Sequence, residues 1–586
     1  MTEIDTEVLI VGGGPAGLSM AALLGHFGID CVLVERRATV NPHPRARSIN
    51  VRTGEIFRLL DVLDEIREVS LPLRWCEQMI YTESLAGAEI GRTTMSVQPV
   101  VDGETVSPAP WLLSSQDQIE PIIRRAAEAH PTVQVWFDAA LEDIEVRPDG
   151  VKAQIGPPTN ASIGTMADPV GDEPQLRSGP PRREQPRRGW WVNARFVVGA
   201  DGASSAVRRA LGITMEGETN LATLVNCHFR ADLDRWTQHR PAALYWTTEP
   251  ARNVFQKIDT DHRWLCQIGY DPRRNKPSDF DRETAAAWIR RSIGDAEVSV
   301  DVSDVIPWVM ASTVAERFRH RAAFLIGDAA HQLPPSGGFG MNTAIQDAHN
   351  LSWKLAYVLR GAAEADLLDS YETERAPIAC YNAARSLENT RNVGRIRKRV
   401  EQGGDRATVA EAVAAAGRYG NWLGMDLGLH YEHGNLVPDG TAPPHVADPV
   451  ADYRQTARPG HRAPHLRLAD GTFTLDHYDR HTTVVAGSAL TDMTSGSRPG
   501  PRTGPDVAQP WVGDGAFPIV ISLGPDDAEA ENRHDRYGIE STGAVLVRPD
   551  GHVAWRQRRG VTMADVQAAM EQLHLHPGRG HHAPGL

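Results

Sequence analysis

Apolar and polar positions in the first part of the chain follow the pattern of an alternating α/β structure. Residues 6–11 (TEVLIV) are a short apolar run that ends at glycines, which is typical of a buried parallel strand. Residues 18–27 have helical spacing and end at Gly28, and residues 31–34 form a second apolar run. The order strand, glycine turn, helix and strand predicts a βαβ unit.

The same alternation continues to about residue 200. Residues 114–130 predict a helix, because their isoleucines recur at helical spacing. Further strands are predicted at 133–137, 141–146, 151–155 and 191–200. Residues 156–189 are rich in Pro, Gly and Arg and lack apolar periodicity, so we expect an exposed, poorly ordered insertion between two strands.

The pattern changes between about residues 213 and 310, where strand-like segments follow one another with few helices between them. These segments are 224–230, 243–247, 253–258, 264–270 and 298–308. They indicate a largely antiparallel sheet in a second domain. A buried strand then returns at 323–326 and is followed by a glycine-rich loop and a long helix at about 342–359.

These patterns predict several domains, as the length of 586 residues also suggests at about 150 residues per domain. We assign 1–75, 112–212 and 311–395 to a discontinuous first domain. The second domain comprises 76–111 and 213–310. Residues 396–465 are a helical segment and a Pro/Gly/Asp-rich linker, and 466–586 form a small α/β domain.

Composition and charge exclude some classes of protein. Hydrophobic residues make up 41% of the chain, so wholesale disorder is excluded. The formal net charge of −14 disfavours nucleic acid as the main partner, because an acidic surface repels phosphates. The five cysteines form no CxxC pair, and such a sparse, odd set fits a reducing cytoplasm better than a secreted disulfide framework.

Residues 8–25 contain no charge, but we do not expect them to cross a membrane or to direct secretion. The residues before this segment are acidic, and its glycines and Pro15 would break a spanning helix.

The first glycine turn, Gly12-Gly13-Gly14-Pro15-Ala16-Gly17, has the spacing G-x-G-x-x-G between a predicted strand and a predicted helix. Glycines at these positions allow backbone N–H groups to approach a pyrophosphate, and the helix N-terminus favours negative charge. Glu35 ends the second strand, where an acid binds a ribose diol. The pattern predicts a dinucleotide site but does not separate NAD from FAD.

Two more glycine turns follow predicted strands. Residues 199–202 (GADG) place Asp201 where it can accept hydrogen bonds from loop amides or shape the mouth of a pocket. Residues 327–342 (GDAAHQLPPSGGFGMN) place Asp328 directly after a strand, where it can accept from a ribityl or ribose hydroxyl. Its glycines allow a planar ring to lie against backbone at the start of a helix. The sequence therefore predicts one site built from distant segments.

With these three motifs in this order, the chain resembles the single-component (group A) FAD-dependent aromatic hydroxylases, the family of para-hydroxybenzoate and phenol hydroxylases, from about residue 6 to residue 375. The resemblance implies an α/β fold: a Rossmann-like FAD-binding domain with an inserted, largely antiparallel substrate domain. Residues 458–464 and 545–556 further resemble the C-terminal thioredoxin-like domain of phenol-hydroxylase-type members. No cysteine follows Cys380, so a dithiol function is excluded there.

The resemblance also implies roles for individual residues. Glu35 would bind the ADP half of FAD, Arg45 would lie beside the pyrophosphate, and Asp328 would bind the ribityl chain. Asp201 would serve both FAD and NAD(P)H, and the carbonyl of Pro335 would face the substrate and the flavin edge. The implied FAD-binding residues are Gly12, Gly14, Pro15, Ala16, Gly17, Glu35, Arg36, Arg45, Gln116, Asp201, Asp328, Gly340, Met341 and Asn342.

The implied activity is that of a cytoplasmic FAD-dependent NAD(P)H:O2 monooxygenase, either a monomer or a homodimer, that hydroxylates a small aromatic substrate through a flavin C4a-hydroperoxide. The overall pattern is most similar to hydroxylases that tailor aromatic polyketides. An apolar chamber in the strand-rich domain would hold the ring, with Tyr245, Trp246 and Trp308 as candidate pocket residues. No general base and no metal site is assigned.

Other outcomes of the same chemistry stay open: hydroxylation of a simple phenol, Baeyer–Villiger oxygenation, or a ring rearrangement. A flavin halogenase would need a W-x-W-x-I-P segment, which Trp308 does not provide. A flavin-binding protein without turnover would not need the intact loop at 335–340.

Overall fold

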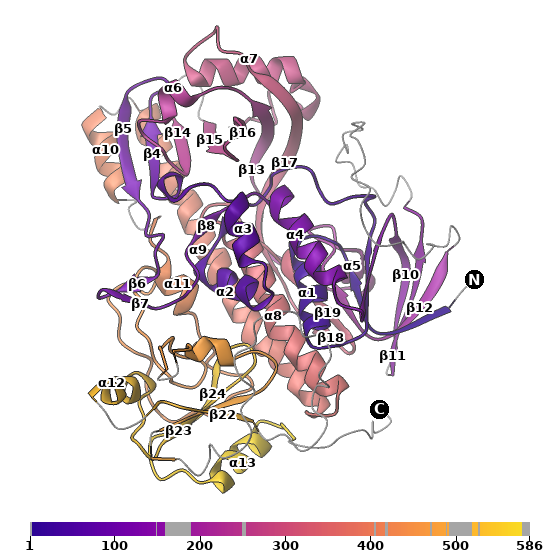
Figure 1. Ribbon diagram of the computed structural model, residues 1–586. Helices are drawn as coiled ribbons and strands as arrows, with labels where there is room; N and C mark the ends of the chain where they lie inside the picture. Colours follow the sequence, from indigo (N-terminus) through magenta and orange to yellow (C-terminus); the bar gives the residue numbers. More distant parts are fainter. Residues whose placement is uncertain are drawn as a thin grey trace.

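The computed structural model describes residues 3–147, 149–158, 189–248, 253–402, 406–415, 420–468, 471–487, 489–490, 518–524 and 528–576. Figure 1 shows a central α/β part, a second sheet above it and a C-terminal part, in yellow, below it. Most of the predicted insertion at 156–189, from residue 159 to residue 188, lies outside the described residues.

The first sheet has a parallel centre. Its main order is β10-β11-β12-β1-β2-β9, and β19 pairs with β12. The strands are β1 (Glu3–Val11), β2 (Cys31–Glu35), β9 (Val133–Phe137), β10 (Ala140–Arg147), β11 (Gly150–Gly156), β12 (Trp190–Gly199), β18 (Arg319–His320) and β19 (Ala323–Leu325). β1 pairs in parallel with both β2 and β12, and β12 pairs in parallel with β19. The ends of β1, β12 and β19, each followed by a glycine turn, therefore meet at one edge of the sheet.

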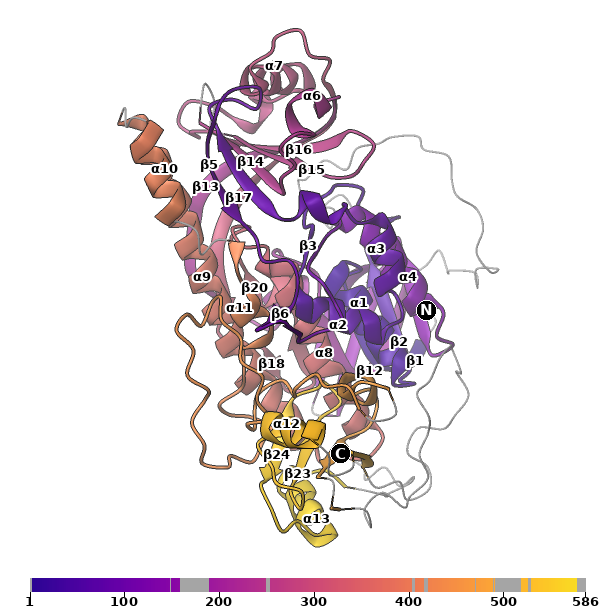
Figure 2. The same cartoon turned by 60° about the vertical axis from the view of Figure 1, so that its left-hand side comes forward.

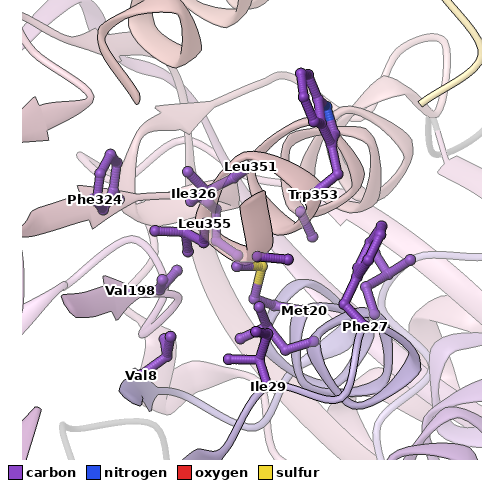
Figure 3. Close-up of a cluster of buried hydrophobic side chains, with 14 of the residues drawn as sticks. Val8, Met20, Phe27, Ile29, Val198, Phe324, Ile326, Leu351, Trp353 and Leu355 are labelled. Carbon is purple, nitrogen blue, oxygen red and sulfur yellow. The ribbon is translucent and has the colours of Figure 1, made fainter. Parts of the chain in front are cut away.

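Two helices bury this parallel centre. α1 (Pro15–His26) and α8 (Phe339–Leu359) are buried on most of their faces, as expected for helices packed on several sides. Figure 3 shows Met20 of α1 and Leu355 of α8 in one cluster with the strand residues Val8 and Val198, and all four side chains are fully buried. The predicted βαβ unit is present, with the glycine turn between β1 and α1.

The second sheet is mostly antiparallel and has the order β20-β17-β13-β16-β15-β14-β4-β5. Its strands are β4 (Gln78–Thr82), β5 (Glu89–Thr94), β13 (Met215–Arg230), β14 (Leu244–Thr247), β15 (Asn253–Lys257), β16 (Arg263–Gly269), β17 (Asp301–Ala315) and β20 (His331–Gln332). One of its faces packs on α7 (Arg282–Ile293). β14 and β4 form a parallel pair, which joins the 213–310 segment to strands that precede it by more than 100 residues.

Helices that follow α8 support the other side of this sheet. α9 (Asp369–Glu401) runs beside β17, and α10 (Arg406–Ala415) packs on β5, as Figure 2 shows. The remaining elements are α2 (Val51–Leu59), α3 (Leu63–Val69), α4 (Gln116–Glu128), α5 (Ala206–Ala210), α6 (Asp234–Thr237), α11 (Leu423–Leu427), β3 (Ser48–Ile49), β6 (Val100–Val101), β7 (Glu104–Thr105) and β8 (Leu112–Leu113). None of the described helices combines the length and the apolarity that crossing a membrane requires.

The C-terminal part has a four-stranded sheet of order β22-β21-β23-β24. Its elements are β21 (Thr483–Ala486), β22 (Ile519–Ser522), β23 (Ala544–Val547), β24 (Val553–Gln557), α12 (Ala528–Tyr537) and α13 (Met563–Gln572). Within 396–465, the segment expected to contain a linker, the side chains of Tyr453 and Arg462 are buried against the rest of the protein. That this part is thioredoxin-like stays a prediction.

A buried ionic network joins the C-terminal part to α8 and α9. Arg548 donates to both carboxylate oxygens of Glu374 at 2.7 and 2.9 Å, and Lys354 of α8 donates to Glu374 at 2.7 Å. All three side chains are almost fully buried. Burial alone would raise the pKa of Glu374, but the two cations outweigh it and lower that pKa to about 2.

We expect Glu374→Gln to lower the free energy of unfolding by about 3–5 kcal/mol, because it leaves the buried Lys354 without its anion and Arg548 with Asp550 as its remaining anionic partner. Urea unfolding measures the loss.

The stabilisation by Glu374 also depends on pH, because its pKa is lower in the folded than in the unfolded protein. It is complete above about pH 4.5 and is lost as the pH falls toward about 2. The difference in unfolding free energy between the two proteins therefore narrows below about pH 4.5. Glu218→Gln is the matched control: its ion pair with Arg391 is exposed, so its loss changes stability by at most about 1 kcal/mol. Equal losses in the two variants would contradict a structural role for the buried network.

Candidate functional site

The first glycine turn is shaped by backbone contacts that leave no room for side chains. Gly12 has a φ of +111°, and a Cβ at this position would lie 2.3 Å from the carbonyl oxygen of Ala200. A Cβ on Gly17 would lie 1.9 Å from the carbonyl oxygen of Gly12. A Cβ on Gly14, by contrast, would meet no protein atom within 4 Å. The turn therefore packs tightly against the protein on one side and leaves open space at the N-terminus of α1, where backbone N–H groups favour an anion.

Glu35 supports this turn from the end of β2. Its carboxylate accepts hydrogen bonds from the backbone N–H groups of Gly13 (2.7 Å) and Arg37 (2.9 Å). A carboxylate can accept about four hydrogen bonds, so Glu35 keeps capacity for hydroxyl donors. Arg36, the next residue, is half-buried.

The second turn lies against the first. The backbone of Asp201 would be 2.8 Å from a Cβ on Gly12. The carboxylate of Asp201 accepts from the backbone N–H groups of Ala206 (2.6 Å) and Val207 (3.1 Å) and from the hydroxyl of Ser205. Asp201 therefore accepts hydrogen bonds from loop amides, which is one of the two roles that the sequence predicted for it. These hydrogen bonds hold the start of α5 in place.

The third turn also reaches the first. A Cβ on Gly327 would lie 3.3 Å from the Cβ of Ala16 in α1 and 3.0 Å from that of Ala344 in α8. Asp328 follows Gly327 and is exposed, yet the surrounding protein desolvates its carboxylate and raises its pKa. Arg45 and His331 act on this pKa in the opposite direction. An acid that is accessible to water but surrounded by protein lies in a concave surface.

Arg45 is exposed in the loop that precedes α2. The neighbouring Ala46 accepts a hydrogen bond at 2.7 Å from the backbone N–H of Gln116, the first residue of α4. The side chain of Gln116 donates to Glu120, and burial raises the pKa of Glu120 to about 7. The structure therefore brings Arg45 near Asp328 and places Gln116 behind the same loop.

The loop before α8 forms a tight turn. The carbonyl of Pro335 accepts from the N–H of Gly338 at 3.0 Å, and Asn389 of α9 donates to the carbonyl of Ser336 at 3.2 Å. Pro335 itself is exposed. Gly340 and Met341 then fall in the first turn of α8, and a Cβ on Gly340 would meet no protein atom within 4 Å. Open space therefore lies beside the N-termini of both α1 and α8.

Asn342 organises this loop rather than projecting from it. Its Nδ2 donates to the carbonyls of Ser48 (3.0 Å) and Gly338 (2.7 Å), and its Oδ1 accepts from the N–H of Asn50 (2.9 Å). The carboxylate of Asp426 accepts in turn from Nδ2 of Asn50 at 3.0 Å. Asn50 and Asp426 were missed by the sequence analysis, because no motif or periodicity marks them.

His331 is held in place within the third motif. Its Nε2 lies 2.7 Å from Asp347, and Arg375 donates to the other oxygen of Asp347 at 2.8 Å. His331 and Asp347 are fully buried. We therefore assign His331 a structural role in the loop.

The candidate pocket residues of the second sheet divide between its two faces. Tyr245 is fully buried in the core on the α7 side, and its hydroxyl donates to the carbonyl of Arg240 at 2.7 Å. Successive side chains of a strand point to opposite faces, so Trp246 points the other way and stacks on Tyr81. This position removes Tyr245 from the pocket residues that the sequence suggested. Trp308 of β17 is half-exposed, and its Nε1 donates to Asn226 of β13 at 2.8 Å.

Two family models match the chain. The model described as FAD binding domain matches residues 5–166 and 172–386, and the model described as aromatic-ring hydroxylase, C-terminal, matches residues 456–577. These two matches cover the three glycine turns and the C-terminal sheet.

Relatives of known name match over nearly the full length. A putative polyketide hydroxylase of Streptomyces halstedii is 32% identical over 97% of this chain and 96% of its own length. A 2,4-dichlorophenol 6-monooxygenase of Delftia acidovorans is 30% identical over 95% of this chain and 96% of its own length. Among solved structures, the flavin-dependent monooxygenase PieE in complex with FAD and substrate superposes with a TM-score of 0.80 at 30% identity, covering 97% of this chain and 99% of that chain. An aklavinone-11 hydroxylase with FAD and aklavinone superposes with a TM-score of 0.74 at 28% identity, covering 98% of this chain and 100% of that chain.

Gly14→Ala tests the open space at the N-terminus of α1 without disturbing the protein. Because the added methyl group meets no protein atom within 4 Å, we expect the FAD-free protein to unfold at the same temperature as the unmodified chain. If the FAD pyrophosphate occupies that space, the methyl group displaces it, and the Kd for FAD rises at least about ten-fold. Fluorescence titration with FAD measures the change. Gly394→Ala, an equally unobstructed glycine in α9, is the control and leaves the Kd unchanged; an unchanged Kd in both variants would place the pyrophosphate elsewhere.

Asp426 predicts a pH dependence of stability. Burial raises its pKa to about 7, above the unfolded value of about 3.9, so the native state binds a proton that the unfolded state releases. The free energy of unfolding therefore falls as the pH rises from about 4 to about 7, with a slope of up to about 1.4 kcal/mol per pH unit from this residue. Urea unfolding across this range checks the expectation. We expect Asp426→Asn to gain stability relative to the unmodified chain as the pH rises. Asp64→Asn is the control and does not, because Asp64 is exposed. Parallel curves of unfolding free energy against pH for all three proteins would contradict this role of Asp426.

Proposed function

Because the chain belongs to the family of FAD-dependent aromatic-ring hydroxylases, we propose that it hydroxylates one ring of a polycyclic phenolic substrate, with NAD(P)H as reductant and O2 as co-substrate. The observation that carries the proposal is the meeting of three glycine turns beside open space at the starts of α1 and α8. Whole-length similarity to a polyketide hydroxylase and to an aklavinone hydroxylase supports the polycyclic substrate.

FAD fits the residues that surround this open space. N–H groups at the start of α1, beside Gly14, would bind the pyrophosphate, and the exposed Arg45 would add positive charge. The carboxylates of Glu35 and Asp328 would accept hydrogen bonds from ribose and ribityl hydroxyls. Each of these groups has the sign of charge or the hydrogen-bonding capacity that its part of FAD requires.

The remaining assigned residues would shape or line the site. Gly12 and Gly17 would allow the close approach of backbone, and Asp201 would hold the second turn against the first. The residues that we propose to line the FAD site in addition are Pro15, Ala16, Arg36, Gln116, Gly340, Met341 and Asn342.

FAD, when bound, supplies the activation of O2 after reduction by NAD(P)H. The residues of this chain would orient the ring system and the substrate. The N–H groups in the first turn of α8 would favour negative charge at the neighbouring ring edge, because a helix N-terminus carries a partial positive charge. Asn342 and Asn389 would fix the loop that presents the carbonyl of Pro335, and the second sheet would exclude water from the reacting ring.

A simple phenol is the second candidate substrate, because the 2,4-dichlorophenol 6-monooxygenase is nearly as similar to this chain as the polyketide hydroxylase. The two candidates differ in the size of the ligand that the site must accept.

NADPH oxidation under air by the FAD-loaded protein tests the proposal. We expect 1,8-dihydroxyanthraquinone or another tricyclic phenol to stimulate oxidation and to gain one oxygen atom, as read by mass spectrometry. Gly394→Ala serves as an active control variant. Stimulation by 2,4-dichlorophenol alone would favour the second candidate, and NADPH oxidation that no aromatic compound accelerates would contradict hydroxylation.

A further inference from the structure

One face of the second sheet links the Arg45 loop to α9. On β17, the carboxylate of Asp304 lies 3.0 Å from Nδ1 of His43, two residues before Arg45. Farther along the same strand, the hydroxyl of Ser312 donates to the carbonyl of Ala383 in α9 at 3.4 Å. Side chains two residues apart share a face, so Trp308 lies on this face between the two contacts.

This position is close in the fold to the loop before α8. β17 pairs with β20 at Val314 and His331, and the chain leaves β20 directly into the Pro335 turn. Trp308 is half-exposed, whereas Ser312 farther along the strand is buried. Trp308 therefore marks the part of the face that is free to line a substrate chamber.

The neighbouring strand β13 places Asn226 on the same face. His228, two residues farther along β13, points toward Asp304, with 3.9 Å between Nδ1 and the carboxylate. The hydrogen bond from Nε1 of Trp308 to Oδ1 of Asn226 fixes how the amide is turned, because an indole N–H can only donate. The NH2 group of Asn226 consequently faces away from Trp308.

This NH2 group lies in a mostly buried position. Asn226 is 8% exposed, and no acceptor for its Nδ2 is found among the described residues. Apolar side chains of the same sheet surround it: Leu224 is on the same strand, and Leu265 and Val254 are on the next two strands. An amide donor in such surroundings costs free energy unless an acceptor reaches it.

The charge around Asn226 indicates which acceptor fits. Asp304 lies against His43 on this face, and Arg263 donates to Asp117 at 2.5 Å and to Asp259 at 3.1 Å. The buried Arg47 contacts the face at Gln256 on β15, to which it donates at 2.7 Å, and not at Asn226. The residue opposite Asn226 on β16 is Gln267, another neutral amide. A neutral donor without a neighbouring free cation matches a neutral acceptor better than an anion, which prefers a charged partner.

We propose that Asn226, oriented by Trp308, donates a hydrogen bond to a carbonyl oxygen of the polycyclic aromatic substrate and so determines which edge of the ring system enters the chamber. The inference rests on the proposed function and assigns Asn226 as a specificity-determining residue. Trp308 acts as its positioning residue.

Three variants distinguish the loss of the NH2 donor of Asn226 from the loss of the hydrogen bond by which Trp308 orients it. Asn226→Leu replaces the amide with an apolar side chain of similar size. Asn226→Asp keeps an acceptor for Trp308 but removes the NH2 donor. Trp308→Phe keeps an aromatic ring but removes the hydrogen bond that orients the amide. Val309→Thr is the matched control, because Val309 adjoins Trp308 on β17, points to the opposite face and is 52% exposed.

The experiment titrates FAD-loaded proteins with two ligands and follows the flavin absorbance, without NADPH. 1,8-Dihydroxyanthraquinone carries ring carbonyls, and 1-naphthol carries none. For the anthraquinone we expect the Kd to rise about ten-fold in Asn226→Leu and Asn226→Asp and by a smaller factor in Trp308→Phe. For 1-naphthol, and for both ligands in Val309→Thr, we expect a change of less than about two-fold. Equal FAD content and far-UV circular dichroism show that each variant is folded.

The outcomes distinguish this inference from the proposed function. An unchanged anthraquinone Kd in both Asn226 variants, or an equal loss for both ligands, would overturn the assignment while leaving the polycyclic substrate standing. If neither ligand perturbs the flavin of the unmodified protein, the proposed polycyclic substrate itself fails, and the inference fails with it.

Discussion

The architecture depends on two backbone segments that touch where no side chain fits. Gly12 lies so close to Ala200 that even a methyl group would clash, and Gly17 lies equally close to Gly12. These contacts require β1 and β12 to be parallel neighbours in register, as they are, with Val11 opposite Gly199. Gly327, after β19, completes the edge through Ala16. Three turns, the first and third of which are separated by more than 300 residues of sequence, thus surround one helix N-terminus, because backbone packs there in place of side chains.

α8 connects this site to the rest of the molecule. Its first turn lies beside the open space, Asn342 holds the loop before it, and Asp347 fixes both His331 and Arg375. Toward its C-terminal half, Lys354 joins the network of Glu374 and Arg548 that anchors the C-terminal part. Buried charges contribute less to stability than apolar packing does, but an arrangement in which all of them are paired admits few alternatives. We infer that the C-terminal part contributes to the site by fixing the position of α8.

The sequence predicted features that depend on local pattern and left out those that depend on register. Glycine spacing and apolar runs were enough for the βαβ unit, and period-two alternation indicated β13, β15 and β16. Residues 76–111 were assigned to the second domain, but the strands β4 and β5 within them were not predicted, because β4 pairs in parallel with β14, a strand distant in sequence. The adjacent residues Tyr245 and Trp246 looked equivalent as pocket candidates, but only the strand register decides which one enters the core. Asn50 and Asp426 carry no local signal, since their roles follow from hydrogen bonds to Asn342 and to one another.

A crystal structure of the chain with FAD and a polycyclic phenol would test the central claim, that the three turns form one flavin site beside the second sheet. The account predicts that the pyrophosphate lies over Gly14 and that the isoalloxazine ring lies at the first turn of α8. It also predicts that the aromatic ligand lies between that ring and the face of β17 that carries Trp308. FAD bound away from the N-terminus of α1, or a ligand on the α7 side of the sheet, would contradict it.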